Sequence, residues 1–339
     1  MAITNNPELI GKKRRLASLS DESGRFSMLA IDQRQSLRKM ISEQTDESSG
    51  SVPDNSLRQI KEVVMSGLSY KASAVLTDPF SGYASAWDRI PGSTGVLLAI
   101  EQTGYAIVND HERLTRLLAE WSVEKALLAG TNGIKLLVWH DKDSSDAVKE
   151  HQCGIVQTIG EACYRYALPF VLEVVCYPTD GKSVAGPQYA NEKALRVIDA
   201  AAEFSHPRYQ VDLLKLEFPG NLQYVKEFAD RSFHGASVVH DLSEIKDFCR
   251  LLDDASRTPW VILSAGVEPK EFIEGIRLCN SAGASGFLCG RAVWKDVVRH
   301  FPNKEAMESY IRTTASASFD LILDANKDAL PWHQHKYFK

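Results

Sequence analysis

Three ionisable residues lie inside short apolar segments of the chain. Lys215 interrupts the run Asp-Leu-Leu-Lys-Leu-Glu-Phe, and two further runs carry Lys135 and Glu173. An unpaired charge is costly to bury, so a lysine is rarely kept inside a strand without a chemical purpose. A desolvated lysine can attack a carbonyl carbon as the neutral amine and form a Schiff base. The sequence therefore predicts covalent carbonyl chemistry, with Lys215 as the nucleophile.

The spacing of these residues also suggests how they meet. Side chains two positions apart share a face of a strand, and alternate strands fill the layers inside a barrel. Lys135 and Lys215 can therefore occupy one layer, with Glu173 between them. A neighbouring cation disfavours a second charge, so each lysine is expected to lower the other's proton affinity. Glu173 could then shuttle protons, or it could pair with the lysine that stays charged. A buried Lys–Glu pair without a catalytic role is the alternative.

The elements that must hold these residues follow from a repeated pattern of short apolar runs and longer amphipathic stretches. Parallel strands need crossover helices and stay apolar when both faces are buried, so the pattern predicts an α/β fold, a (β/α)8 barrel. The expected strands are 26–32, 74–78, 96–101, 134–138, 170–175, 212–217, 260–264 and 286–289. The expected helices include 112–129, 192–204, 242–252 and 269–282.

We expect one domain over residues 1–339, with an N-terminal helix within 1–25 and a C-terminal tail at 326–339. The basic run Lys12–Arg15 predicts a solvated first helix. The polar segment 43–55 predicts a mobile surface loop. The tail carries three aromatic residues, which is consistent with docking on the barrel, with contact to a neighbouring subunit in a homo-oligomer, or with a frayed end.

Composition excludes several classes of partner. The formal charge is −5 with both signs interspersed, which argues against nucleic acid and anionic membranes as partners. No apolar run reaches the roughly 20 residues that span a bilayer. The six cysteines form no C-x-x-C pair and resemble reduced core residues of a cytoplasmic protein. The histidines form no cluster at the strand ends, so we expect neither a metal nor another cofactor.

Polar residues gather where the expected strands end, which is where barrel enzymes place their chemistry. The strand-end carboxylates are Asp32, Asp78, Glu101 and Glu217. Glu101 and Glu217 could hold the lysines in place, whereas Asp78 precedes Pro79 and could simply start a helix. The turns Ser264-Ala265-Gly266 and Gly290-Arg291 follow the last two strands and predict a phosphate site. The lysines and this site together imply a phosphorylated carbonyl substrate.

The segments that carry these residues resemble the class I tagatose-1,6-bisphosphate aldolase family, in order, from about residue 15 to about residue 296. The matching segments are LAIDQR at 29–34, LTDP at 76–79, LAIEQTGY at 98–105, KLEFP at 215–219, LSAGV at 263–267 and LCGR at 288–291. The resemblance implies a (β/α)8 barrel that cleaves a ketohexose bisphosphate into dihydroxyacetone phosphate and glyceraldehyde 3-phosphate without a metal.

The resemblance also implies roles for individual residues. Lys215 would be the Schiff-base lysine and Glu173 the general acid and base. Three residues would contact the sugar hydroxyls and the carbonyl region: Asp32, Gln33 and Lys135. Three others would line the phosphate and substrate contacts: Ser264, Leu288 and Arg291.

Alternatives remain open at this stage. The segments 260–264, 282–288 and 290–294 are more similar to sulfofructose-1-phosphate aldolases, which give dihydroxyacetone phosphate and sulfolactaldehyde. Phosphate or sulfonate at the far end of the substrate, and the configuration at C4, are therefore both open. Outside the aldolases, a sugar-phosphate-binding regulatory protein would keep the anion site without turnover. An isomerase or epimerase would transfer protons without forming a covalent adduct.

Overall fold

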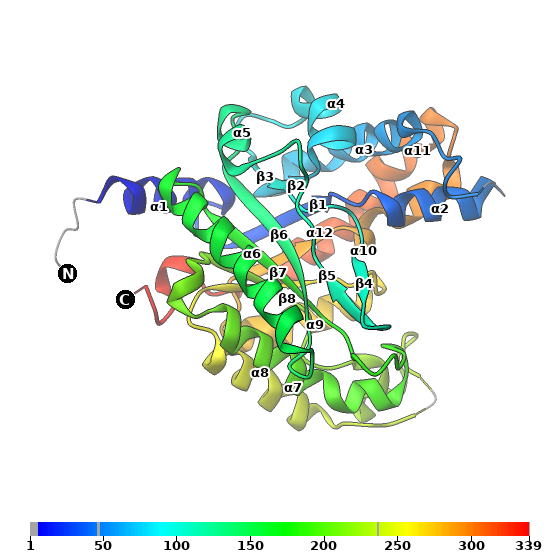
Figure 1. Ribbon diagram of the computed structural model, residues 1–339. Helices are drawn as coiled ribbons and strands as arrows, with labels where there is room; N and C mark the ends of the chain where they lie inside the picture. Colours follow the sequence, from blue (N-terminus) through cyan, green and yellow to red (C-terminus); the bar gives the residue numbers. More distant parts are fainter. Residues whose placement is uncertain (1–5, 46–47, 236, 339) are drawn as a thin grey trace.

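Eight parallel strands close into a barrel in this computed structural model, which describes residues 6–45, 48–235 and 237–338 (Figure 1). Around the barrel the strand order is β1-β10-β9-β8-β7-β6-β3-β2. The strands are β1 Phe26–Ile31, β2 Ala74–Thr77, β3 Gly95–Ala99, β6 Gly133–His140, β7 Phe170–Cys176, β8 Leu213–Leu216, β9 Trp260–Leu263 and β10 Gly286–Cys289. All eight expected strands and the single-domain (β/α)8 fold are confirmed.

Helices cover the outside of the barrel (Figure 1). They are α1 Pro7–Leu19, α2 Gln35–Thr45, α3 Asp54–Leu68, α4 Ala84–Ala86, α5 Val123–Leu128, α6 Asp146–Arg165, α7 Pro187–Phe204, α8 Leu242–Ala255, α9 Pro269–Ala282, α10 Arg291–Trp294, α11 Lys304–Tyr310 and α12 Ser316–Ala325. The helices expected at 192–204, 242–252 and 269–282 correspond to α7, α8 and α9. No helix among the described residues is long and apolar enough to cross a membrane.

The helix expected over 112–129 is wrong. Only α5 forms there, and it is preceded by an antiparallel hairpin of β4 (Ala106–Val108) and β5 (Glu112–Leu114). Asn109 and Asp110 adopt left-handed conformations at the turn, with φ of 48° and 66°, which these two residue types tolerate better than most. The hairpin runs beside β6 near the carboxyl ends of the barrel strands, so the error matters for the site (Figure 1).

Side chains alternate between two cores, as the strand parity predicts. One cluster fills the barrel interior and includes Met28, Ala30, Leu76, Leu97, Ala99, Val171, Leu213, Val261 and Leu288. The other lies between the strands and the helices and includes Leu29, Val75, Leu98, Leu136, Leu172, Leu214 and Ile262. Lys135, Glu173 and Lys215 have the parity of the interior set, so they lie inside the barrel one layer closer to its carboxyl end.

The two ends of the chain pack at the amino-terminal end of the barrel. The backbone N–H of Trp332 donates to Gly24 O at 2.8 Å, and the Trp332 ring joins the interior cluster together with Phe338. The tail is therefore docked on its own barrel and no longer argues for a subunit contact. In α1 the expectation of a solvated basic run fails at Lys12, which is buried and pairs with Asp212 at 2.7 Å.

The segment 43–55 is only partly a loop. Helix α2 continues to Thr45 and α3 begins at Asp54, while residues 48–53 form a turn. Residues 46–47 lie outside the described part of the chain.

The six cysteines are free, and all except Cys153 are buried, as expected for structural residues.

Candidate active site

Lys135 on β6 lies at the centre of the polar layer inside the barrel. Its Nζ is 2.7 Å from Glu101, 2.7 Å from Glu173 Oε2 and 3.0 Å from Asp32. These carboxylates follow β3, lie on β7 and follow β1, so three strands converge on one ammonium. A buried ammonium with three partners can remain charged because each of its N–H donors has an acceptor.

Lys215 on β8 has a different environment. Its Nζ lies 2.8 Å from Glu173 Oε1, and Glu173 is the only carboxylate among the described residues that pairs with it. Glu173 and Lys215 are direct partners in the register of β7 and β8. The two oxygens of Glu173 therefore contact one lysine each, and the carboxylate bridges Lys135 and Lys215.

The charges of this layer support one another. Burial opposes ionisation of Glu173 and Asp32, but the charges of Lys135 and Lys215 outweigh it and hold the pKa of each carboxyl below its ordinary value. Burial likewise opposes the charge on Lys135, but its three carboxylates raise its pKa well above the ordinary value. The three carboxylates therefore decide the proton affinity of Lys135, and the lowering effect expected from the second lysine does not dominate there.

A cavity of about 640 Å³ opens above this layer at the carboxyl ends of the strands. Its lining includes six basic and four acidic side chains. Lys135 and Lys215 are paired within the buried layer. The remaining cations lie on the wall and the rim: Arg34, Lys39, Arg113 and Arg291. A cavity with this surplus of cations is suited to a small anionic molecule.

The cavity brings together most of the residues expected from the sequence. It is lined by Asp32, Gln33, Glu101, Lys135, Glu173, Lys215, Glu217, Ala265 and Arg291. Ser264 and Gly266 line adjoining cavities that share Ala265 with it. Gly290 lies against β1, where an added Cβ would be 2.3 Å from Ala30 O.

Two expected residues lie elsewhere. Leu288 is packed in the apolar interior cluster and does not line the cavity. Asp78 is fully buried with Lys61, and its side chain accepts hydrogen bonds from the backbone N–H groups of Phe80 and Ser81. Asp78 therefore caps the turn that follows β2, which matches the alternative interpretation of Asp78-Pro79.

The turn after β9 is shaped for a close approach. Ala265 and Gly266 both have positive φ, 48° and 81°, and strain of this kind in a non-glycine residue often marks a functional site. An added Cβ on Gly266 would lie 3.6 Å from the guanidinium carbon of Arg291. The exposed backbone of this turn and the Arg291 side chain therefore face one another at one side of the cavity.

A protein-family model described as DeoC/LacD family aldolase matches residues 26–296 of the sequence. The chain belongs to this family. Tagatose 1,6-diphosphate aldolase of Lactococcus lactis subsp. lactis is 33% identical over 326 residues, 95% of this chain and 97% of that protein. Tagatose 1,6-diphosphate aldolase 1 of Enterococcus faecalis (strain ATCC 700802 / V583) is 35% identical over 313 residues, 91% and 92% of the two chains.

Solved structures agree on the fold of this DeoC/LacD aldolase. Fructose-bisphosphate aldolase from Plasmodium falciparum, in complex with TRAP and a small molecule inhibitor, aligns with a TM-score of 0.68 at 13% identity over 96% of both chains. An archaeal fructose 1,6-bisphosphate aldolase aligns with a TM-score of 0.56 at 14% identity, over 92% of this chain and 99% of that one. At this identity the likeness shows a shared barrel.

Several residues of the aldolase cavity were missed from the sequence. Arg34 donates to Glu101 O at 2.8 Å and follows Asp32 and Gln33 in the motif already singled out, so its position was a usable signal. Arg113 was hidden by the wrong helix, although the adjacent Asn109 and Asp110 are residue types that favour turns. Among the described residues, no group of three or more His, Cys, Asp or Glu side chains is arranged to hold a metal ion.

Proposed function

We propose that this DeoC/LacD aldolase is a class I enzyme that cleaves a ketohexose 1,6-bisphosphate, D-tagatose 1,6-bisphosphate in the first instance. The products are dihydroxyacetone phosphate and D-glyceraldehyde 3-phosphate. The observation that carries the proposal is the contact of Lys215 with Glu173, 2.8 Å apart at the base of a cationic cavity. The relatives named as tagatose 1,6-diphosphate aldolases support the choice of substrate.

The reaction begins with a covalent bond to the enzyme. Lys215 passes a proton to Glu173 and attacks C2 of the ketose as the neutral amine. The hydroxyl of the resulting carbinolamine takes this proton from Glu173 and leaves as water, which gives an iminium ion. Glu173 then removes the proton of the C4 hydroxyl, the C3–C4 bond breaks, and its electron pair moves into the iminium to give an enamine. Glyceraldehyde 3-phosphate leaves. General acid–base catalysis of this kind contributes about 10²–10⁴-fold.

Glu173 completes the cycle by reversing its role. It returns the proton to C3 of the enamine, and water hydrolyses the resulting iminium to release dihydroxyacetone phosphate and protonated Lys215, paired again with Glu173. Lys135 stays charged throughout because three carboxylates hold its proton. Its fixed charge orients Glu173 and Asp32 toward the sugar hydroxyls. The turn at Ala265 and the guanidinium of Arg291 receive the C1 phosphate.

The test is a coupled assay for release of dihydroxyacetone phosphate with EDTA present. It compares tagatose 1,6-bisphosphate, fructose 1,6-bisphosphate and sulfofructose 1-phosphate. Borohydride added with substrate should trap a secondary amine that peptide mass mapping places on Lys215. The variant Lys215→Ala should lose both activity and adduct, whereas Lys142→Ala, at an exposed lysine, should keep both.

Each other outcome contradicts a stated part of the proposal. Activity that survives Lys215→Ala would exclude a Schiff base at Lys215. A preference for sulfofructose 1-phosphate would mean that the natural substrate carries a sulfonate at C6 in place of the phosphate. Stabilisation by these ligands without any product would indicate a sugar-phosphate-binding protein.

A further inference from the structure

The β4–β5 hairpin carries an arginine into a cluster of aromatic rings at the cavity. The guanidinium carbon of Arg113 lies 4.4 Å from the ring centre of Tyr105, 4.7 Å from that of Trp139 and 4.6 Å from that of Tyr177. Trp139 makes edge contacts with both tyrosines. These four side chains, here called the Arg113 cage, fix the arginine by cation–π contacts.

The cage leaves the hydrogen-bond donors of Arg113 available. Its guanidinium makes no ion pair or hydrogen bond with any side chain in the described ranges, and aromatic faces cannot satisfy the five N–H donors of an arginine. Arg196, by comparison, pairs with both Asp141 and Glu192. Arg113 lines the cavity together with Tyr105 and Trp139, so its free donors are accessible to a ligand there.

The backbone around Arg113 is tied down on two sides. Its N–H donates to the hydroxyl of Tyr177 at 2.9 Å, and its carbonyl accepts from Gln152 of α6 at 3.3 Å. The preceding residue, Glu112, is buried and accepts hydrogen bonds from Asn109 at 2.6 Å and from the Ser145 hydroxyl at 2.8 Å. The hairpin is thus fastened to the start of α6.

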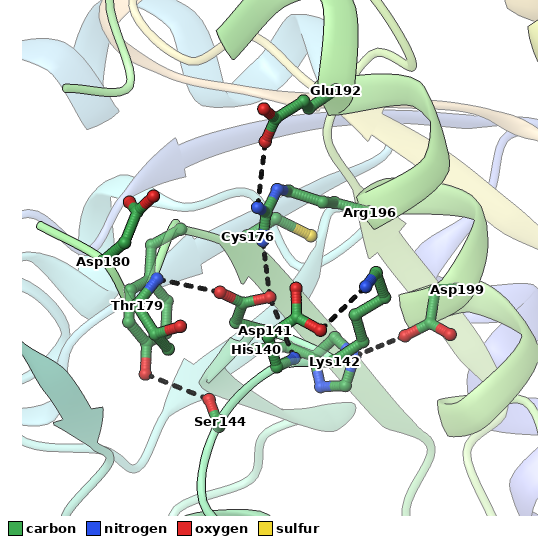
Figure 2. Close-up of polar contacts among 12 residues, drawn as sticks. His140, Asp141, Lys142, Ser144, Cys176, Thr179, Asp180, Glu192, Arg196 and Asp199 are labelled. Carbon is green, nitrogen blue, oxygen red and sulfur yellow. Dashed lines mark hydrogen bonds and ion pairs between the residues drawn. The ribbon is translucent and has the colours of Figure 1, made fainter. Parts of the chain in front are cut away.

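A second network of polar contacts lies around Asp141, close in sequence to two of the rings (Figure 2). Asp141, which follows Trp139 by two residues, accepts from the backbone N–H of Thr179 at 2.8 Å, and Thr179 follows Tyr177 by two residues. Asp141 also accepts from Arg196 of α7. Asp141 is only 2% exposed, so this link between the loops after β6 and β7 is shielded from water. The two rings are therefore positioned by a buried carboxylate.

The cage lies across the barrel from the proposed phosphate site. In the strand order, β6 and β3 are opposite β10 and β9. Trp139 ends β6 and Tyr105 follows β3, whereas Arg291 follows β10. The layer with Lys215 and Glu173 lies between them. A ketose bound to Lys215 with its C1 phosphate at Arg291 would therefore extend its other end toward Arg113.

We propose that Arg113 binds the anionic group on C6 of the substrate and determines the preference for ketoses that carry one. The proposal rests on the aldolase function proposed above and extends it to a specificity residue. A guanidinium matches two oxygens of a phosphate or sulfonate with two parallel N–H groups. The cage holds this fork extended and partly desolvated before the ligand arrives, so less conformational freedom is lost on binding.

The experiment measures a ratio, kcat/KM for the ketohexose 1,6-bisphosphate over kcat/KM for the same ketohexose 1-phosphate. The wild type should prefer the bisphosphate. Arg113→Met should lower the ratio by about 10²-fold, because two charge-assisted hydrogen bonds are lost at C6 only. Arg113→Lys keeps the positive charge but lacks the two parallel N–H groups of the guanidinium. Its ratio should therefore fall between those of the wild type and Arg113→Met. The surface variant Lys142→Met should keep the wild-type ratio.

The outcomes separate this proposal from the one that it extends. A wild type that cleaves neither compound overturns the aldolase function itself. Equal losses on both substrates leave the ratio unchanged and make Arg113 a structural residue. Wild-type values of kcat/KM on both substrates place the C6 anion elsewhere, and either result overturns the assignment. Should Arg113→Met fail to fold in thermal unfolding, the ratio for Arg113→Lys decides: a value equal to the wild type overturns the proposal.

Discussion

Two lysines point into this barrel from different strands, and they differ in the number of carboxylates around them. Lys135 is held by three carboxylates, which raise its pKa, whereas Lys215 contacts Glu173 alone. A lysine held by three carboxylates is poorly suited to lose a proton and attack a carbonyl. A lysine with one shared partner can pass its proton to that partner or to the substrate. The asymmetry therefore argues that Lys215 is the nucleophile and Lys135 the fixed charge.

Removal of the fixed charge should destabilise the fold. Lys135→Met keeps the apolar length of the side chain but leaves Asp32, Glu101 and Glu173 close together without their cation. Breaking a buried ion pair costs about 3–5 kcal/mol, so we expect a loss of that size in urea unfolding at pH 7. Adding Glu101→Gln should recover part of it. Lys142→Met should change stability by less than about 0.5 kcal/mol, and a similar small effect at Lys135 would contradict the argument.

The sequence could identify these residues but not their partners. A charged residue inside an apolar run is visible in the chain, and strand parity places it inside the barrel. The carboxylates around Lys135 come from strands far apart in sequence; Asp32, for example, is 103 positions away. Only the closed barrel brings them together, so the sequence could not show that carboxylates dominate the proton affinity of Lys135.

Elements were predicted well where burial alone decides them and poorly where long-range hydrogen bonds do. The barrel strands are buried on both faces and read as apolar runs. The segment 112–129 has apolar residues at helical spacing, yet Leu118 N donates to Ile100 O at 2.9 Å and Gln102 N donates to Arg116 O at 2.7 Å. Hydrogen bonds to the residues just after β3 therefore hold this part of the segment in an extended conformation. The helical spacing of its apolar residues could not reveal those bonds.

The backbones of β10 and β1, which pair where the barrel closes, approach each other closely at Gly286. Gly286 pairs with Phe26 at φ 130°, and an added Cβ would lie 1.9 Å from Phe26 O. Gly286→Ala should therefore cost roughly 2–5 kcal/mol through strain and overpacking. The same change at Gly154, inside α6 with open space around it, should stabilise by about 0.5–1 kcal/mol. Chemical denaturation of both variants checks the opposite signs, and equal effects would contradict this account of β10.

At the scale of the whole molecule, chemistry and stabilisation occupy opposite ends of the barrel. The cavity with Lys215 lies at the carboxyl ends of the strands. The amino-terminal end is closed by α1 and by the tail, whose Trp332 packs under the interior cluster. The docking of the tail could not be predicted from the sequence, because its three aromatic residues are equally consistent with contact to the barrel, contact to another subunit and a frayed end. Conservative changes in the tail should therefore alter stability and leave kcat/KM unchanged.

The tail also carries a pH-sensitive contact. His335 is buried near Asp253, 3.9 Å away, and beside Lys336, and its ring nitrogens have no hydrogen-bond partner among the described residues. Burial lowers the pKa of His335 below its ordinary 6.5, against the pull of Asp253. The unfolded chain therefore takes up the proton first. The stabilising contribution of His335 is complete above pH 6.5 and is lost as the pH falls through the lower pKa of the folded state.

The measurement is the loss of unfolding free energy between pH 7.5 and pH 5.5, obtained from urea titrations. His335→Gln removes the titrating group, so its loss should be smaller than that of the wild type. His333→Gln, at an exposed histidine of the same tail, should lose as much as the wild type. Equal losses in all three proteins would mean that the docked tail tolerates a charged imidazole. A larger loss in His335→Gln would reverse the sign, and with it the conclusion that the fold holds this ring neutral.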